Sequence, residues 1–260
     1  MEGERALEYR FVVDRSAAEG VLRRAATRLT PEVHAPERPV LYCRTLYLDS
    51  EDGMYLHTFK RGATACRARV RQYAAAGDLA GEARVTGASA WLELKRTCGL
   101  EREKVRLERT VEELSALLHG EAPPLAGLPP RGGFAPALGE VIAQVAAGRI
   151  RPCLLTWYRR WSLGRAPLRI TLDEGIAYCL PEPLAAAGTR CEPRAVIARD
   201  TLAVLEVKLS GAMPGWLEEE VAGVARHLAL RHSKFRAGME AIRQAQPTTP
   251  RNNREFRNTG

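Results

Sequence analysis

The chain has 260 residues, of which 45% are hydrophobic and 27% charged, a composition typical of a folded globular protein. It contains no run of roughly 18 apolar residues that could form a membrane helix, and its N-terminus lacks the apolar segment of a signal peptide. Its net charge of +8 predicts an anionic partner, which could be nucleic acid, a membrane surface or a phosphorylated small molecule.

The first half of the chain is expected to consist mainly of strands. Alternating apolar and polar residues mark strands at residues 7–13, 40–48, 65–73, 91–96 and 103–107. The sequence Ser-Ala-Ala-Glu at residues 16–19 is a capping box, which predicts a helix from there to about Leu29. Residues 54–59 are ambiguous, and residues 74–87 are expected to form a flexible, hairpin-like connection.

The second half begins with helices. A second capping box, Thr-Val-Glu-Glu, opens a predicted helix over residues 110–118, and another helix is predicted over residues 137–147. Further strands are expected at residues 154–163, 168–172, 176–179 and 203–209. Two amphipathic helices follow, one over residues 214–230 and one that begins after Ser233.

Together these elements predict an α+β fold. Eight to ten strands joined mostly by short turns, with four or five helices outside them, favour an antiparallel barrel or sandwich. We expect one domain over residues 1–246 and a polar, disordered tail over residues 247–260.

Several strands place charged side chains on one face and apolar side chains on the other. Residues 205–209, Leu-Glu-Val-Lys-Leu, present Glu206 and Lys208 on one face, and residues 92–95 repeat the Glu-x-Lys step. The same alternation applies to Glu8, Arg10, Arg67, Arg69, Arg71, Arg160, Arg169 and Asp173. One such step usually marks the solvated face of an antiparallel sheet, but its repetition in many strands indicates a shared charged interior.

A charged interior needs something to balance it. Two cations about 7 Å apart repel each other by roughly 2 kcal/mol at an effective dielectric constant of 20. A lumen lined mainly by cations is therefore stable only with water, counter-carboxylates or an anionic ligand inside it.

Seven short motifs carry a resemblance to a known family. They are, in chain order, Glu8-Tyr-Arg10, Arg67-Ala-Arg69-Val-Arg71-Gln-Tyr73, Glu93-Leu-Lys95, Tyr158-Arg-Arg160, Arg169-Ile-Thr-Leu-Asp173, Leu205-Glu206-Val-Lys208 and Arg231-His-Ser233-Lys234-Phe235. In this order they resemble the VTC (vacuolar transporter chaperone) polyphosphate polymerase domain, one of the triphosphate tunnel metalloenzymes. The resemblance covers residues 7–242. It implies an eight-stranded antiparallel β-barrel, the triphosphate tunnel, with peripheral helices.

The resemblance also implies roles for individual residues. The phosphate ligands by motif position are Arg10, Arg69, Arg71, Lys95, Arg160, Arg169, Arg231 and Lys234. Lys208 is a further candidate ligand because it shares a strand face with Glu206, which is implied to hold Mn²⁺ or Mg²⁺. Lys95, Arg160 and Lys234 are the candidate catalytic residues. Phosphoryl transfer depends mainly on positioning and charge neutralisation, which these residue types provide.

Two positions depart from the family pattern. Arg10 and Arg231 stand where the family often has Lys, which keeps the charge but changes its geometry. The hydrolase branch of the superfamily, which includes thiamine triphosphatases, typically begins with Glu-x-Glu-x-Lys. This chain has Ala6 at the first of those positions, and the difference favours the polymerase branch.

The resemblance therefore implies an ATP-dependent polyphosphate polymerase that moves the γ-phosphate of ATP onto a growing chain. The alternatives are a metal-dependent hydrolase of tripolyphosphate or nucleoside triphosphates, and a non-catalytic module that binds polyphosphate or inositol phosphate. Glu206 favours an enzyme, since a passive phosphate binder gains little from an inward carboxylate. The expected partners are ATP, polyphosphate or another triphosphate; nucleic acid is not expected, and a membrane-bound partner stays open.

The remaining reactive residue types are expected to be structural. The five histidines show no metal-ligand spacing, and the six cysteines show no C-x-x-C pair, which predicts a cytoplasmic protein with free, buried thiols. Trp157 and Trp161 alternate with Tyr158 and Arg160, so we expect them to pack under helices, with stacking on a nucleobase as the alternative.

Overall fold

The computed structural model describes residues 7–32, 40–51, 53, 65–98, 101–121, 135–165, 167–224 and 233–245. Over these residues the chain forms one antiparallel sheet and five helices. The strands are β1 (Leu7–Val13), β2 (Val40–Ser50), β3 (Ala65–Ala76), β4 (Arg84–Val85), β5 (Ser89–Cys98), β6 (Glu101–Thr110), β7 (Ile150–Arg165), β8 (Leu168–Cys179), β9 (Val196–Arg199) and β10 (Ala203–Leu209). The helices are α1 (Arg15–Ala25), α3 (Val111–His119), α4 (Ala135–Ala146), α5 (Gly215–Ala222) and α6 (Lys234–Ala245). None of these helices is long and apolar enough to cross a membrane.

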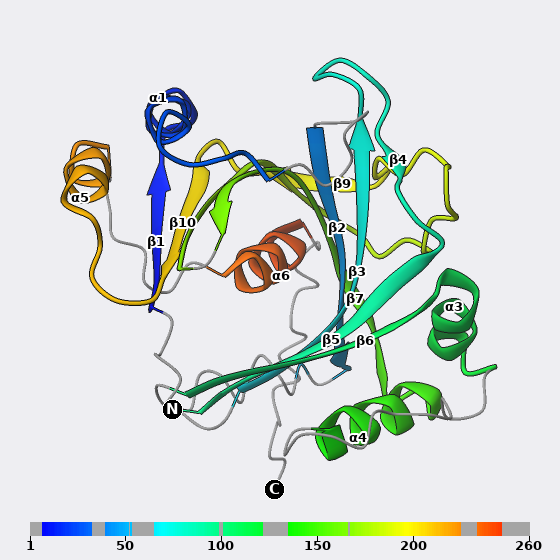
Figure 1. The fold of residues 1–260 in the computed structure, drawn as a ribbon. Coiled ribbons are helices and arrows are strands. Elements are labelled where there is room, and N and C mark those ends of the chain that lie inside the picture. The colour runs from blue at the N-terminus through cyan, green and yellow to red at the C-terminus, as the bar shows by residue number, and fades with distance from the viewer. Residues whose placement is uncertain are drawn as a thin grey trace, which may run out of the picture.

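Eight strands follow one another in the order β1-β10-β8-β7-β2-β3-β5-β6, while β4 pairs with β3 and β9 with β8. Figure 1 shows that this sheet curves around α6, with α1 and α5 outside one end of the curve and α3 and α4 outside the other. The expected α+β class and antiparallel path of eight strands are therefore confirmed.

Closure of the barrel is not observed in the described part of the chain. The path ends at β1 and β6, and these two strands do not pair with each other. Helix α6 lies inside the curve, where Phe235 packs with apolar residues of β2, β7 and β8 and covers part of the concave face. The sheet therefore buries apolar area against a helix there.

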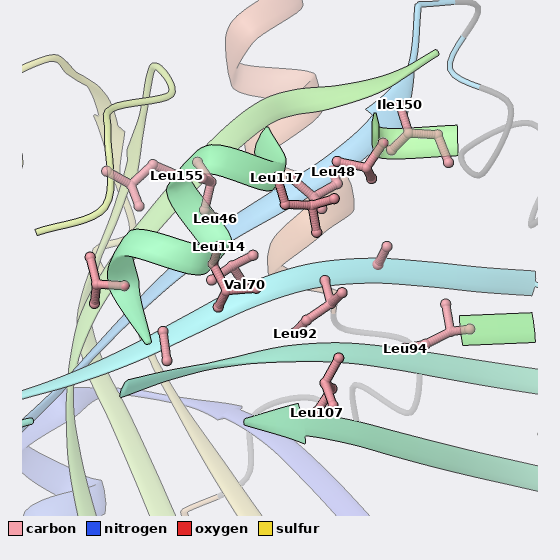
Figure 2. Packing of buried hydrophobic residues seen from close by; sticks show 14 of the residues in the cluster. Leu46, Leu48, Val70, Leu92, Leu94, Leu107, Leu114, Leu117, Ile150 and Leu155 are labelled. Carbon is pink, nitrogen blue, oxygen red and sulfur yellow. The ribbon is translucent and has the colours of Figure 1, made fainter. Parts of the chain in front are cut away.

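The largest apolar cluster lies on the outer face of the sheet, beneath α3 and α4. Figure 2 shows Leu114 and Leu117 of α3 against Leu46 and Val70 of the strands. All four side chains are at most 2% exposed. A fully buried leucine contributes about 1.5 to 3 kcal/mol, so this layer fixes which face of each strand points outward.

A second cluster joins the outer face of β1, β8 and β10 to α1 and α5. Leu205, Val207 and Leu209 of β10 are buried in it, as the alternation in residues 205–209 predicts. Their burial leaves Glu206 and Lys208 on the concave face.

Some local expectations are corrected by the structure. Helix α1 begins at Arg15 after an extended Asp14 that makes no side-chain cap bond, so the predicted Ser16 capping box is wrong, and the helix ends at Ala25. The capping box at Thr110 is confirmed, since its hydroxyl accepts from the Glu113 amide at 3.2 Å.

The predicted strands at 168–172 and 176–179 form one continuous strand, β8. Gly175 has φ +60°, and the register with β7 shifts between Trp157 and Arg159, so a bulge carries the strand past the glycine. Strands β4 and β9 were not expected. Helix α5 ends at Ala222, and residues 54–59, 225–230 and the tail 247–260 lie outside the described residues.

Candidate functional site: a cation-lined cavity

The concave face of the sheet holds a cavity of about 530 Å³, a size typical of small-molecule sites. Among the described residues, eleven cations from seven strands and α6 line it. They are Arg10, Arg67, Arg69, Arg71, Lys95, Lys104, Arg106, Arg160, Arg169, Lys208 and Lys234. The carboxylates of its described lining are Glu32 and Glu206, so positive charge prevails.

The cations face inward because their apolar neighbours are held outward. On β3, Ala68 and Val70 are 1% exposed and belong to the cluster beneath α3 and α4. Successive side chains of a strand point to opposite faces, so burying these two places Arg67, Arg69 and Arg71 on the concave face.

Glu93 of β5 organises the cations of the neighbouring strands. Its carboxylate lies 2.6 Å from Arg69, 2.7 Å from Lys104 and 2.6 Å from Arg106. Burial alone would raise the pKa of Glu93, but Arg69, Arg71 and Lys104 together hold it well below its usual range. Burial also lowers the pKa of Lys104, to about 7, against the attraction of Glu93. Glu93 is thus ionised and lets several cations lie close together.

Asp173 of β8 joins two of the predicted catalytic residues. Its Oδ1 accepts from Arg160 Nε at 2.6 Å, and its Oδ2 accepts from Arg160 Nη2 and from Lys234 Nζ, both at 2.7 Å. Both cations also lie over the ring of Tyr158, at 5.4 Å for Arg160 and 4.7 Å for Lys234. Burial would raise the pKa of Asp173, yet the two cations hold it well below its usual range. Arg160 and Lys234 are therefore oriented before any ligand arrives.

Glu206 of β10, the predicted metal ligand, is held by two cations. Its Oε2 accepts from Arg10 Nε at 3.0 Å, and its Oε1 lies 2.6 Å from Lys208 Nζ. Arg10 also pairs with Glu8 on the same face of β1. Burial opposes ionisation of Glu206, but Lys208 and Arg10 bring its pKa down to about 2, so the carboxylate is charged at neutral pH.

A divalent cation fits this carboxylate only together with a ligand. Among the described residues there is no cluster of three or more His, Cys, Asp or Glu that could hold a metal. Mg²⁺ commonly binds through one or two carboxylates and completes its shell with phosphate oxygens and water. Glu206 fits that pattern, because phosphates entering the cavity would attract Lys208 and Arg10 and release its oxygens.

Arg71 and Arg169 complete the set in different surroundings. Arg71 is only 6% exposed and donates long hydrogen bonds to Thr45, at 3.4 Å, and to Tyr158, at 3.5 Å. Arg169 pairs with Glu32, which follows α1, at 2.7 Å. Sequence reasoning missed Glu32 because nothing in its local pattern indicates that it reaches β8.

The structure brings together eight of the nine predicted phosphate ligands. Those lining the cavity are Arg10, Arg69, Arg71, Lys95, Arg160, Arg169, Lys208 and Lys234. Arg231 lies outside the described residues.

Three cations of the cavity were not among the predicted ligands. Arg67 was placed on the charged face without a role, and Lys104 and Arg106 of β6 were not considered. Lys104 and Arg106 could have been found from the predicted hairpin of β5 and β6, in which Lys104 pairs with Lys95 and Arg106 pairs with Glu93.

The aromatic residues divide between the two faces. Trp157 packs in the outer cluster, stacked on Tyr42 with ring centroids 4.9 Å apart, in agreement with the expectation. Trp91, to which the sequence assigned no role, lines the cavity. The four cysteines described are free thiols; Cys43, Cys179 and Cys191 are buried, as expected, and Cys153 is partly buried.

The curved antiparallel sheet around a cation-lined cavity agrees with the triphosphate-tunnel architecture that the sequence resemblance implied. More particularly, the VTC domain model matches residues 5–243, so the chain belongs to the VTC domain family.

Two solved structures are similar to the chain at low sequence identity. A proposed adenylyl cyclase from Hippeastrum, for which a dominant triphosphatase activity is described, is 14% identical with a TM-score of 0.51, covering 91% of this chain and 96% of its own. A proposed adenylate cyclase from Bacillus halodurans is 11% identical with a TM-score of 0.45, covering 98% of both chains. No curated protein sequence matches the chain. At these identities the similarity concerns the fold alone.

Proposed function

We propose that this VTC domain is an ATP-dependent polyphosphate polymerase. The terminal oxygen of a polyphosphate chain would attack the γ-phosphorus of ATP, the bond from that phosphorus to the β,γ-bridging oxygen would break, and ADP would leave. The observation that carries this proposal is the cavity itself, in which eleven cations from seven strands and α6 surround a space of about 530 Å³. A multiply charged triphosphate is the kind of ligand that balances such a lining.

The residues have distinct roles in this proposal. Arg160 and Lys234, fixed by Asp173, would bind phosphate oxygens with little reorganisation, which is where preorganised donors are most effective. Lys95 would bind phosphate from the β5 side of the cavity. Mn²⁺ or Mg²⁺ held by Glu206 would neutralise phosphate charge when bound.

A second candidate is a metal-dependent triphosphate hydrolase, which differs only in using water as the acceptor. The fold shared with the Hippeastrum protein favours it. The family match and the absence of the first carboxylate of the hydrolase motif, at Ala6, favour the polymerase. A passive binder would have no use for the ionised Glu206.

Incubation with ATP and Mn²⁺ or Mg²⁺ tests the proposal, with polyphosphate resolved on gels and ADP and free phosphate assayed in parallel. We expect polyphosphate to lengthen with one ADP released for each phosphate added. Free phosphate without polymer would identify the hydrolase, and binding without turnover a binding module. Arg160→Ala should abolish turnover. Arg190→Ala is the control and should leave turnover unchanged, because the Arg190 side chain is 60% exposed and lies outside the cavity.

A further inference from the structure

One corner of the cavity is aromatic. Tyr73 of β3 and Trp91 of β5 both line it, with ring centroids 5.3 Å apart and ring planes at 65°. Both side chains are only partly buried. Leu41 also lines the cavity, and so does Thr86, whose hydroxyl donates to the Tyr73 carbonyl at 3.2 Å.

The aromatic pair lies directly beyond the cations. The inward side chains along β3 are Arg67, Arg69, Arg71 and then Tyr73, and Trp91 is the strand partner of Arg71. Both rings therefore lie at the same end of the row of arginines. Inward neighbours on one strand are about 7 Å apart, a separation comparable to the ribose that joins a base to its phosphates.

Core packing explains only one member of the pair: Tyr73 packs against the apolar cluster that contains Phe235 and Tyr158, whereas Trp91 belongs to none of the three described apolar clusters. The outer face of the same strands supplies the core, through Val70 and Leu92, which are at most 1% exposed. In an edge-to-face pair each ring keeps a face that the other ring does not cover. A flat aromatic ligand would bury those faces, whereas an inorganic phosphate chain would not.

We propose that Tyr73 and Trp91 form a nucleobase subsite, so that the donor substrate is a nucleoside triphosphate and not inorganic tripolyphosphate. This inference rests on the proposed function, because the two rings can receive the base of a nucleotide only if the cations bind its triphosphate. Stacking is tolerant of base identity, and the hydroxyl of Thr86 is already engaged by the backbone. We therefore expect purine nucleotides to bind best, with little distinction between ATP and GTP.

Calorimetric binding of ATP and of tripolyphosphate without metal tests the subsite apart from turnover. Trp91→Leu should weaken the affinity for ATP about tenfold or more, since stacking on one base contributes a free energy of about that size. The affinity for tripolyphosphate should stay within about twofold of the parental value. Trp91→Phe should largely restore ATP binding. Trp216→Leu is the matched control, because Trp216 packs with the outer cluster of α1 and α5.

The possible outcomes distinguish failure of the nucleobase subsite from failure of the proposed function. Equal weakening of ATP and tripolyphosphate by Trp91→Leu, or no weakening of either, would overturn the nucleobase subsite while leaving the phosphate site intact. Binding of neither ligand by the parental protein would overturn the proposed function as well. If Trp91→Leu does not fold, Tyr73→Leu and quenching of parental tryptophan fluorescence by ATP but not tripolyphosphate give the same decision.

Discussion

At the scale of single residues, three carboxylates hold the cations of the cavity in place. Glu93, Asp173 and Glu206 each contact two or more cations, and the pKa of each is lowered despite burial. Removing one partner from a buried ion pair leaves the other charge uncompensated, which is strongly destabilising. The three carboxylates differ in role because they differ in position. Glu93 and Asp173 are at most 1% exposed and hold the neighbouring cations in place, whereas Glu206 lines the cavity.

Glu206→Gln should separate metal-dependent chemistry from phosphate binding. The amide keeps the size of the side chain but removes a charge that, with a pKa of about 2, is present throughout the neutral range. We expect turnover with Mn²⁺ or Mg²⁺ to fall by about 100-fold or more, the scale of one strong transition-state interaction. Tripolyphosphate should bind at least as tightly without metal, because Arg10 and Lys208 lose a competitor.

Lys95→Ala is the contrasting variant, since it should weaken phosphate binding and turnover together. Steady-state kinetics and calorimetry on both variants give the comparison. Parental turnover by Glu206→Gln would show that Glu206 does not hold the metal.

At the scale of elements, α6 depends on a close approach to the sheet at Gly238. A Cβ atom at this position would lie 2.5 Å from Leu154 Cδ2 and 2.8 Å from Tyr178 Cδ1. Both neighbours are at most 2% exposed and have no room to move. The approach positions Lys234, at the start of α6, beside Asp173.

Gly238→Ala and Gly20→Ala should therefore change stability in opposite directions. Alanine in a helix interior is favoured over glycine by about 1 kcal/mol, and at Gly20 in α1 the nearest contact is the flexible end of Arg24 at 3.4 Å. At Gly238 an overpacking cost of about 1 to 3 kcal/mol opposes that gain.

Urea unfolding should show Gly20→Ala slightly stabilised and Gly238→Ala destabilised, with weaker tripolyphosphate binding in the second variant only. A stabilised Gly238→Ala protein with normal binding would show that α6 does not need this contact.

The sequence predicts elements well where the pattern is local. Strand β10 was predicted with its bounds because Leu205, Val207 and Leu209 alternate with Glu206 and Lys208. The continuity of β8 through Gly175 depends on its register with β7, which no local pattern encodes. The same holds for β9, whose four residues pair with β8 alone among the described strands.

The candidate site follows the same division. The charged faces could be read strand by strand, but which strands lie opposite each other depends on the curvature of the whole sheet. Arg69, for example, was expected to face inward. Only the structure shows that it contacts Glu93 and that Glu93 also contacts Lys104 and Arg106. The same is true of the short distance between Tyr73 and Trp91.

At the scale of the whole molecule, the cavity concentrates like charge that only an anion can balance. Cations about 7 Å apart repel by roughly 2 kcal/mol at an effective dielectric constant of 20, and eleven of them share this lining. Three internal carboxylates offset part of the repulsion. A ligand long enough to contact several strands should relieve more of it than a compact one.

Tripolyphosphate should therefore stabilise the folded protein more than monophosphate at the same concentration. A ligand at a hundredfold excess over its dissociation constant adds about 2.7 kcal/mol to the free energy of unfolding. For a chain of this size that is a rise in melting temperature of about 5 to 10 °C, measurable by differential scanning calorimetry. The rise should shrink in the Arg160→Ala protein and persist in Arg190→Ala, whose change lies outside the cavity. Equal shifts with monophosphate would mean that the cations act singly, because a ligand that reaches only one or two of them would then relieve the same repulsion.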